Sequence, residues 1–340
     1  MPGSMQAGFM IISRTPLRIS FVGGGSDLPS FYHGEPGAVV STAINKYIYI
    51  SVNNKFDRKI RASYSVTEIV DQVDDLRHEL IREAMKVVGA DGGIEITSIS
   101  DIPSQGTGLG SSSTYTVGVL NALHAHAGRH AGAERLAREA CDIEIARCHK
   151  PIGKQDQYIA AFGGLQHIQF NPDDSVYVDP IICTPQCKRE LQGSLLMLYT
   201  GITRSAESIL QEQKANVETD AGRRAVLHEM VQLARQVRDS LCCNDLDGFG
   251  EALHQGWMNK KRLASGISSP KIDAWYERAR QHGAIGGKVL GAGGGGFLLL
   301  YAHRDRHPEI IKALPDLRPI SFHFEPQGSK IIYVEENGHG

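Results

Sequence analysis

Hydrophobic positions in the first hundred residues follow two different periods, one typical of strands and one typical of helices. Residues 9–24 and 38–54 are rich in isoleucine, valine and aromatic side chains and alternate over part of their length, which predicts strands. We expect the first stretch to break near Pro16 and the second to form a pair of strands. Residues 73–89 instead space their apolar side chains at helical intervals and end in glycine, which predicts a helix.

The middle of the chain combines a strand, a loop of small residues and two helices, in that order. Residues 93–103 predict a strand, and "GTGLGSSS" follows it before helices predicted at 114–127 and 133–149. The start of a helix has unpaired N–H groups and a partial positive charge, and glycines let the backbone approach a ligand. This order therefore favours binding of an anion such as phosphate, and a capped helix after a flexible loop is the other interpretation.

The remainder of the chain predicts a second unit of strands and helices. Residues 151–164 are expected to form a turn, and the polar stretch 183–194 to separate two strand-rich parts. Strands are predicted at 165–170, 176–181, 194–200, 297–302 and 330–336, the last two as a pair, and helices at 205–217 and 223–241. We expect an α+β protein of two domains, residues 10–185 and 190–340.

Composition narrows the classes of function that the chain can have. The 340 residues carry a formal net charge of −2, whereas a general nucleic-acid-binding protein usually shows a basic excess. No apolar run approaches the roughly 20 residues that span a bilayer, and the six cysteines form no CxxC pair. We expect a cytoplasmic protein with reduced thiols that binds neither nucleic acid nor membrane, and for which a homodimer is one arrangement.

Three glycine-rich segments lie far apart, at residues 16–29, 106–115 and 288–301. The third, "KVLGAGGGGFLLLY", does not fit the dinucleotide-binding fingerprint, because a strand rather than a helix follows its glycines. The second has no lysine after its last glycine, so it is not a P-loop. Neither of these common nucleotide motifs explains the set.

Taken in this order, the three segments resemble the motifs of the GHMP kinase superfamily, and "GLGSSS" after "PSQGT" is the most specific match. The resemblance extends from about Ile11 to Glu336. It implies an N-terminal α/β domain, like a ribosomal protein, beside a ferredoxin-like C-terminal domain, with the active site between them. It also implies that ATP binds along the middle motif, at Gly106, Gly108, Leu109, Gly110, Ser111, Ser112 and Ser113.

Two segments resemble one branch of this superfamily. "RTPLRISFVGGGSDLP" and "PIGKQDQYIAAFGGL" look like kinases that phosphorylate D-glycero-D-manno-heptose 7-phosphate at its anomeric hydroxyl, giving the 1,7-bisphosphate. Galactokinases would carry a Gly-Glu-His-Thr-Asp-like segment where this chain has Gly23 to Asp27. The resemblance further implies a role in making nucleotide-activated heptose for a surface polysaccharide, such as a capsule, a lipopolysaccharide or an S-layer glycan.

The same resemblance assigns the reaction chemistry to Asp156 and Arg18. Asp156, in "GKQDQY", matches the family's catalytic aspartate, which would hold and deprotonate the acceptor hydroxyl. Arg18 lies where relatives carry a Lys or Arg that would stabilise the transferring phosphoryl group. From the residues alone, a turn aspartate and an exposed strand arginine are the alternatives.

Magnesium is the cofactor that the resemblance implies besides ATP. Glu144 lies twelve residues before Asp156 and matches the metal-binding glutamate, and the hydroxyl of Ser112 would be its partner on the ion. Ser111 could take the place of Ser112, and Glu144 could instead be a solvated helix residue.

The acceptor, a sugar phosphate, is expected to contact the first and third glycine-rich segments. Asp27 would accept hydrogen bonds from sugar hydroxyls, unless it only forms a turn before Pro29. The predicted substrate-binding set is completed by Gly24, Gly25, Ser26, Gly293, Gly294, Arg204 and Lys261. The acceptor's phosphate is expected to bind Arg204 or a member of the basic run Lys260, Lys261 and Arg262, from which Lys261 is placed in the set. A solvated helix face is the alternative for this run.

Two other functions fit the same motifs. A kinase of a free sugar, such as L-fucose, mannose or galactose, would need no basic pocket for an acceptor phosphate. A sensor that binds sugar and ATP without catalysis would be expected to lose the base or the metal ligand, and both are present at Asp156 and Glu144.

Overall fold

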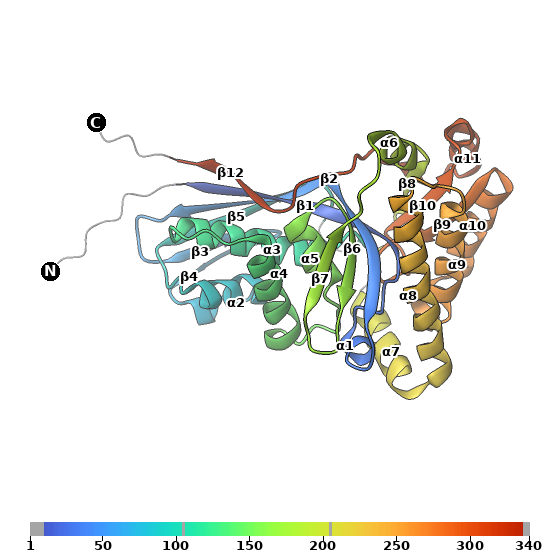
Figure 1. Cartoon of the computed structure of the whole chain (residues 1–340). Helices are drawn as coiled ribbons and strands as arrows, with labels where there is room; N and C mark the ends of the chain where they lie inside the picture. The colour runs from blue at the N-terminus through green and yellow to red at the C-terminus, as the bar shows by residue number, and fades with distance from the viewer. Residues whose placement is uncertain (1–9, 104–105, 204–205, 336–340) are drawn as a thin grey trace.

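The computed structural model describes residues 10–103, 106–203 and 206–335, and these residues form two sheets flanked by helices (Figure 1). The strands are β1 (Ile11–Val22), β2 (Gly37–Asn54), β3 (Ile60–Ser63), β4 (Thr67–Val70), β5 (Ile94–Ser100), β6 (Leu165–Phe170), β7 (Val176–Pro180), β8 (Leu195–Tyr199), β9 (Ala284–Val289), β10 (Phe297–Ala302), β11 (Arg318–Pro319) and β12 (Lys330–Val334). The helices are α1 (Pro29–Tyr32), α2 (Glu79–Val88), α3 (Ser111–His126), α4 (Ala133–Cys141), α5 (Gln155–Phe162), α6 (Pro185–Gly193), α7 (Ala206–Thr219), α8 (Ala221–Cys242), α9 (Phe249–Lys261), α10 (Pro270–Gln281) and α11 (His307–Ala313).

The first sheet is built around two long strands. Its order is β12-β1-β2-β5-β3-β4, with β6 and β7 joined through β2. β2 serves two neighbours along one edge, because its residues up to Thr42 pair with β6 and those from Ile48 pair with β5. The long β1–β2 pair carries the first glycine-rich segment from the sheet to the other half of the molecule, where the site lies (Figure 1).

The prediction of broken strands near the start of the chain is wrong. β1 continues through Pro16, and its register against β2 shifts between Pro16 and Leu17, which accommodates the proline. Residues 38–54 lie in the single strand β2, whose first eight residues are all buried. A strand buried on both faces shows little alternation, so its course cannot be read from polarity.

α3 is the central helix of the first half and packs against β1 and β2, with α2, α4 and α5 beside it. It begins at Ser111, three residues before the predicted start, so all three serines lie in its first turn. Thirteen of the fourteen residues from Ser111 to His124 are buried, and Ser112 alone in that stretch is exposed, so the helix shows little amphipathic pattern. The predicted turn at 151–164 is also wrong in part, because it contains α5.

The second sheet is antiparallel, in the order β11-β8-β10-β9. α9 packs on β9 and on α8, and α8 in turn contacts β1, β2 and β6, so these helices join the two sheets. Figure 1 shows α8 between the first sheet and the second. The stretch 183–194, predicted as a polar separator, contains α6. This mixed arrangement agrees with the predicted α+β kinase fold and its ferredoxin-like second half.

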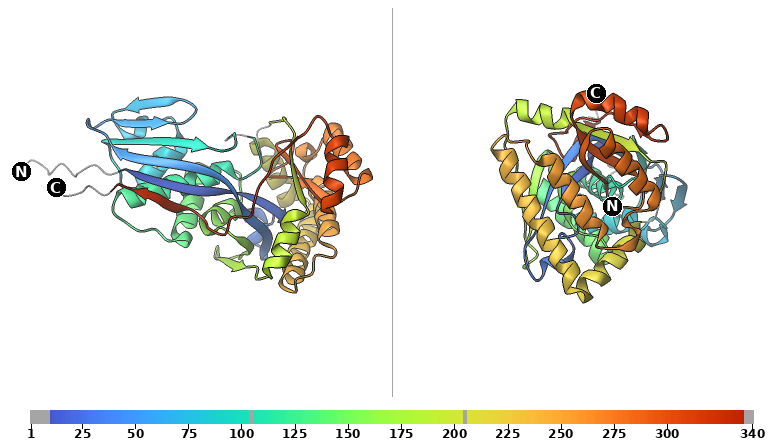
Figure 2. Two further views of the ribbon diagram at one scale, coloured as in Figure 1. Left: turned by 90° about the horizontal axis from the view of Figure 1, so that it is seen from above. Right: turned by 90° about the vertical axis from the view of Figure 1, so that its right-hand side faces the viewer.

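The two ends of the described chain lie side by side. β12 pairs antiparallel with β1, and the backbone N–H of Glu335 donates to the carbonyl of Met10 over 2.9 Å. The left view of Figure 2 shows β12, in red, beside β1, in dark blue, at the edge of the first sheet. The predicted pairing of the last two strands is therefore wrong, since β10 belongs to the second sheet. The division at 10–185 and 190–340 stays a prediction, and β12 falls in the second range while lying in the first sheet.

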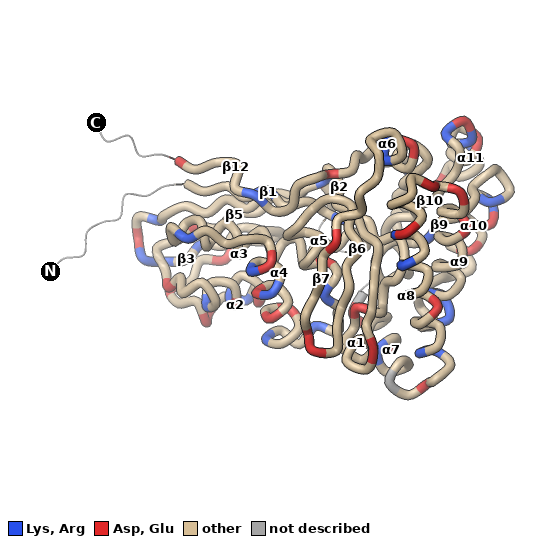
Figure 3. Tube along the Cα trace, viewed as in Figure 1, with Lys and Arg blue, Asp and Glu red and all other residues tan. Residues whose placement is uncertain are grey.

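Charged residues of both signs are interspersed along the helices and loops in Figure 3. Within the described residues, none of the helices is both long enough and apolar enough to cross a membrane. Among the same residues, no cluster of three or more His, Cys, Asp or Glu side chains is placed to hold a metal ion.

Candidate active site

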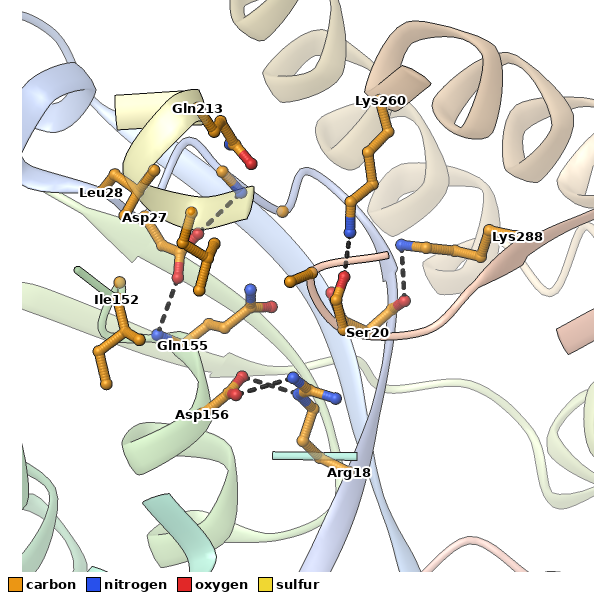
Figure 4. Close-up of a pocket in the computed structure, with 16 residues that line it drawn as sticks. Arg18, Ser20, Asp27, Leu28, Ile152, Gln155, Asp156, Gln213, Lys260 and Lys288 are labelled. Atoms are coloured by element: carbon orange, nitrogen blue, oxygen red, sulfur yellow. Dashed lines mark hydrogen bonds and ion pairs between the residues drawn. The ribbon is translucent and has the colours of Figure 1, made fainter. Parts of the chain in front are cut away.

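A pocket lies where β1, the first glycine-rich loop and the start of α5 meet α7, α9 and β9 (Figure 4). The first half of the chain lines it with Arg18, Ser20, Gly24, Gly25, Asp27, Leu28, Ile152, Gly153, Gln155 and Asp156. The second half adds Leu210, Gln213, Lys260, Lys288, Gly291 and Ala292. The pocket is therefore formed between the two halves, and it contains both proposed catalytic residues.

Arg18 and Asp156 form a two-point ion pair at one wall of this pocket. Nε of Arg18 lies 2.7 Å from Oδ1 of Asp156, and Nη2 lies 2.7 Å from Oδ2. Nη1 donates to the carbonyl of Gly108 over 2.6 Å, so the guanidinium also holds the middle glycine-rich loop. Arg18 is only 4% exposed, and a buried bidentate pair fixes the orientation of the carboxylate as well as its charge. The predicted exposed-arginine alternative is excluded.

The middle glycine-rich loop passes directly beside the ion pair. Gly110 is the last residue before α3 and has a φ of +74°, a left-handed conformation that glycine adopts without strain. A Cβ at this position would lie 3.1 Å from Cγ of Arg18 and 3.2 Å from Oδ2 of Asp156. The loop can therefore approach the pair this closely only because the residue has no side chain.

The third glycine-rich loop packs on the middle one, backbone against backbone. A Cβ on Gly108 would lie 2.2 Å from the carbonyl oxygen of Leu290, and one on Gly291 would lie 2.4 Å from Cα of Gly108. A Cβ on Gly296 would lie 2.3 Å from the carbonyl oxygen of Thr107. The glycines of the third segment thus support the loop that leads into α3.

The serines at the start of α3 have different partners. Oγ of Ser112 donates to Oε1 of Glu144 over 2.6 Å, whereas Oγ of Ser111 lies 3.2 Å from Oγ1 of Thr107. Ser113 is buried. Of the two serines that the sequence left open, Ser112 is the one that the fold brings to the glutamate.

Glu144 is fully buried rather than solvated, in a π-helical turn, Asp142–Arg147, that follows α4. Its Oε2 accepts a hydrogen bond from Nε2 of Gln157 over 2.6 Å. Burial raises the pKa of Glu144 to about 7, and the hydrogen bonds of Ser112 and Gln157 oppose that rise. A buried carboxylate beside a hydroxyl is a suitable oxygen pair for Mg²⁺, which takes few protein ligands and fills its other positions with phosphates and water.

Asp27 is buried at the end of the first glycine-rich loop. Its Oδ1 accepts the backbone N–H of Gly25 over 2.8 Å, and its Oδ2 accepts that of Gln155 over 3.3 Å. Burial, and to a smaller extent the charge of Asp156, raise the pKa of Asp27. Gly24 and Gly25 line the pocket beside it, whereas Ser26 points away and donates to the carbonyl of Gly23 over 2.8 Å.

Besides Ser26, three of the predicted substrate-binding residues do not line the pocket. Lys261 pairs with Asp273, with Nζ 3.1 Å from Oδ1. A Cβ on Gly293 would lie 2.6 Å from the carbonyl oxygen of Ile267, and the backbone N–H of Gly294 donates to that carbonyl over 2.9 Å. Their neighbours along the chain, including Gly291, face the cavity instead. Arg204 lies outside the described residues.

Two lysines line the pocket: Lys260, which belongs to the basic run considered for the acceptor's phosphate but was not chosen from it, and Lys288, which the sequence analysis did not consider. Lys260 projects from the last turn of α9 and donates to the carbonyl of Gly291, and Lys288 of β9 donates to the carbonyls of Ser20 and Phe21, each over 2.9 Å. Both are buried. The spacing of the buried positions Leu253, Trp257 and Lys260 along α9 places this lysine on the apolar face of the helix. That periodicity was the signal that could have found Lys260.

A buried glutamine completes the pocket wall. Gln213 of α7 is 2% exposed, and its Nε2 has no hydrogen-bond partner within the described structure. Gly25 has a φ of +106°, and a Cβ there would lie 2.3 Å from this nitrogen, so the glycine makes room for the amide. Oε1 of Gln155 likewise lacks a partner among the described atoms. No motif or pattern in the sequence indicates Gln213, which occupies a buried position on its helix between Ile209 and Val217.

Comparisons with known proteins agree with this geometry. The model of the GHMP kinases N terminal domain matches residues 77–164, and that of the GHMP kinases C terminal matches residues 230–317. The chain belongs to the GHMP kinase family. As a GHMP kinase it is a phosphotransferase that uses ATP, and its pocket lies between the two matched regions.

Relatives and solved structures of this GHMP kinase cover most of its length. It is 29% identical over 325 residues to a D-glycero-alpha-D-manno-heptose 7-phosphate kinase of Campylobacter jejuni, which covers 89% of this chain and 93% of that protein. It is 26% identical over 336 residues to an L-fucokinase/L-fucose-1-P guanylyltransferase of Bacteroides fragilis, covering 86% of this chain and 34% of that protein. The crystal structure of a D-glycero-D-manno-heptose 1-phosphate kinase from Bacteroides thetaiotaomicron superposes with a TM-score of 0.78 at 25% identity, over 96% of this chain and 100% of that one.

Proposed function

We propose that this GHMP kinase phosphorylates D-glycero-D-manno-heptose 7-phosphate at its anomeric hydroxyl with ATP, giving the 1,7-bisphosphate. The observation that carries the proposal is the pocket itself. It combines a fixed carboxylate, Asp156, with three cations, Arg18, Lys260 and Lys288, and with a second buried carboxylate, Asp27. The relative of Campylobacter jejuni, named as a heptose 7-phosphate kinase, supports the choice of acceptor.

The proton transfer is assigned to Asp156. As the anomeric oxygen attacks the γ-phosphorus, the bond from that phosphorus to the β,γ-bridging oxygen breaks and ADP leaves with its electron pair. The hydroxyl proton passes to the carboxylate of Asp156, which Arg18 holds in place. An anomeric hydroxyl is more acidic than an ordinary alcohol, so an aspartate is a sufficient base.

The triphosphate is assigned to the middle loop and the start of α3. The backbone N–H groups of the first turn and the partial positive charge of a sixteen-residue helix favour an anion at this end. Mg²⁺ bound to Glu144 and Ser112 would neutralise charge on the phosphates. The hydroxyl of Ser112, on α3, and the carboxylate of Glu144, in the π-helical turn after α4, are held together by the 2.6 Å hydrogen bond between them.

The sugar is assigned to the part of the pocket near Asp27. Both carboxylate oxygens of Asp27 are oriented by backbone N–H groups, and their remaining lone pairs can accept hydrogen bonds from adjacent sugar hydroxyls. The product would enter the synthesis of nucleotide-activated heptose for a surface polysaccharide. We place the enzyme in the cytoplasm, where ATP is available, and a homodimer is one arrangement open to it.

The test is an ADP-release assay with ATP and Mg²⁺ on four acceptors: the heptose 7-phosphate, mannose, galactose and L-fucose. We expect a strong preference for the phosphorylated heptose, with activity lost in Asp156→Ala. The relative of Bacteroides fragilis, named as an L-fucokinase, makes L-fucose the most informative competitor. Preference for an unphosphorylated sugar would make that sugar the acceptor in place of the heptose 7-phosphate. ATP binding without turnover on any acceptor would favour the sensor.

A further inference from the structure

The three cations of the pocket differ in how their charge is compensated. Arg18 is paired with Asp156 at two points. Lys288 is tied to β1 by two backbone carbonyls, each 2.9 Å away. Lys260, by contrast, donates to the carbonyl of Gly291 alone and forms no ion pair within the described part of the chain. Two of the three N–H bonds of its ammonium group are unused, whereas Lys288 has one unused and Arg18 spends its charge on Asp156.

Lys260 is only 6% exposed, although its charge has no bonded counter-ion. Two cations, Arg18 and Lys288, face it, together with the carboxylates of Asp27 and Asp156. Both carboxylates already accept hydrogen bonds from other donors. When all five groups are ionised, three cations face two carboxylates, so the pocket carries one positive charge in excess. Burying a cation without a partner is costly, and an anionic ligand at this place would remove the cost.

We propose that Lys260 is a phosphate-binding residue whose ammonium group contacts a phosphate oxygen of a bound substrate. The inference rests on the proposed function, under which two phosphates reach this pocket: the γ-phosphoryl group of ATP and the phosphate that the acceptor carries. Both present the same oxygen chemistry to an ammonium group. The carbonyl of Gly291 orients the side chain from the third glycine-rich loop, which packs on the loop assigned to ATP.

The neighbouring lysine provides a sharp comparison. From the run Lys260, Lys261 and Arg262, the sequence-based prediction chose Lys261 to bind the acceptor's phosphate, and Lys261 lies against Asp273 outside the pocket. Lys312 of α11 is exposed and far from both roles, so it serves as a control for removal of one surface charge. Three variants are therefore compared. Lys260→Met removes the cation in the pocket, Lys261→Met removes the lysine chosen from the sequence, and Lys312→Met removes one charge from the surface.

The experiment measures kcat and KM for ATP and for two acceptors, D-glycero-D-manno-heptose 7-phosphate and the same heptose without phosphate. If Lys260 contacts the acceptor's phosphate, Lys260→Met should raise KM for the phosphorylated heptose about 10- to 100-fold and leave the unphosphorylated heptose unaffected. If it contacts the γ-phosphoryl group, kcat or the KM for ATP should change by a similar factor with both acceptors. Either result supports the proposal, and Lys312→Met should behave as wild type.

Unchanged kinetics in Lys260→Met, or the same loss in Lys261→Met alone, would overturn the proposal. A binding measurement tests the role of Lys260 independently of the proposed function. In it, inorganic phosphate is titrated into the wild type and the variants by calorimetry. We expect phosphate to bind the wild type and Lys312→Met, and to bind Lys260→Met at least 10-fold more weakly. If the wild type binds phosphate in this way but does not phosphorylate the heptose phosphate, the acceptor assignment fails while Lys260 keeps its role. Equal binding to wild type and Lys260→Met would reject that role.

Discussion

Arg18 and Asp156 lie 138 positions apart in the chain and meet in a bidentate ion pair, with both nitrogen–oxygen distances at 2.7 Å. Nη1 of Arg18 also donates to the carbonyl of Gly108, so Arg18 holds both Asp156, the proposed base, and the loop that we assign to ATP. Asp156 remains partly accessible, with 23% of its side chain exposed, which leaves room for an acceptor hydroxyl. Several consequences of this arrangement can be measured.

Replacing Asp156 with asparagine should remove the base and keep the shape of the wall. We expect kcat to fall about a hundred- to ten-thousand-fold, because general-base catalysis commonly contributes that factor. The affinity for ATP, measured by calorimetry with a non-hydrolysable analogue, should change little. A variant that retained more than a tenth of wild-type kcat would exclude Asp156 as the base.

Gly110→Ala should impair the reaction because the new side chain meets the Arg18–Asp156 pair, and Gly128→Ala is the control for backbone strain alone. The new Cβ would lie 3.1 Å from Cγ of Arg18 and 3.2 Å from Oδ2 of Asp156, and the φ of +74° would add roughly 1 kcal/mol of strain. Gly128, at the other end of α3, has a φ of +68° and open space around its Cβ position. Gly128→Ala should therefore lower the melting temperature to a similar extent without reducing kcat. Equal activity in the two variants would contradict the assigned position of the loop.

Ser112→Ala should raise the Mg²⁺ concentration needed for half-maximal activity, whereas Ser111→Ala should not. The reason is that Oγ of Ser112 lies 2.6 Å from Oε1 of Glu144, and Oγ of Ser111 lies near Thr107 instead. We expect a shift of several-fold for Ser112→Ala, because magnesium keeps its other ligands. Activity is titrated against Mg²⁺ at saturating ATP after removal of metal with a chelator. An equal shift in both variants would mean that Glu144 and Ser112 do not share the ion.

Gln213→Leu should weaken acceptor binding without weakening the fold. Its Nε2 is buried without a partner in the described structure, and a leucine removes that unpaired donor. We expect KM for the acceptor to rise about 5- to 10-fold, with the KM for ATP unchanged and the melting temperature equal or higher. Gln211→Leu, at an exposed position of the same helix, is the matched control. A lowered melting temperature with unchanged KM would show that Gln213 serves the fold alone.

The Lys260 ammonium should make the reaction sensitive to alkaline pH. Burial lowers the pKa of Lys260 to about 8, and the charge of Arg18 acts in the same direction, while Asp27 and Asp156 oppose it. In the free enzyme the positive charge is therefore present below about pH 8 and is lost as the pH rises through that value. The advantage of the wild type over Lys260→Met in kcat/KM should be large at pH 7 and shrink above pH 8.

The stability of the fold should show the opposite trend. The folded state holds the Lys260 proton less tightly than the unfolded chain does, so the unfolded state binds more protons between about pH 8 and the ordinary lysine pKa of 10.5. The wild type should therefore gain stability relative to Lys260→Met as the pH rises through this interval. Urea unfolding of both proteins at pH 7 and pH 9.5 measures this difference in stability. In the kinetic experiment, a ratio of wild-type to Lys260→Met kcat/KM that stays constant with pH would contradict the pKa assigned to Lys260.

The proximity of the residues proposed for catalysis could be predicted because they lie in short, distinctive motifs. Asp156 and Arg18 were assigned from their positions in such motifs, and the fold brings them into contact. Glu144 and Ser112 were assigned in the same way, although the burial of Glu144 in a π-helical turn could not be read from a helix pattern. A π-helical turn shifts the phase of the residues that follow it, so regular helical spacing gives the wrong face there.

The acceptor side was less predictable, because it depends on packing between the two halves of the chain. Lys260 and Lys261 are adjacent, and which of them enters the pocket depends on how α9 is rotated against β9. Gln213 is polar at a position that packing alone would fill with an apolar residue, and only its neighbours in space reveal that it reaches the cavity. The unbroken course of β1 also required knowledge of its partner, since the register shift at Pro16 exists only in the pair.

The return of β12 to β1 sets a constraint on the order in which the protein can be built. One edge of β1 pairs with β12, a strand that is synthesised more than three hundred residues after β1. At 5–20 residues per second, that edge waits roughly 15 to 60 seconds for its partner during translation. Through this interval the backbone groups on that edge are unpaired and can pair with other strands. The sheet that carries Arg18 is thus completed only after the second sheet and its helices have been synthesised.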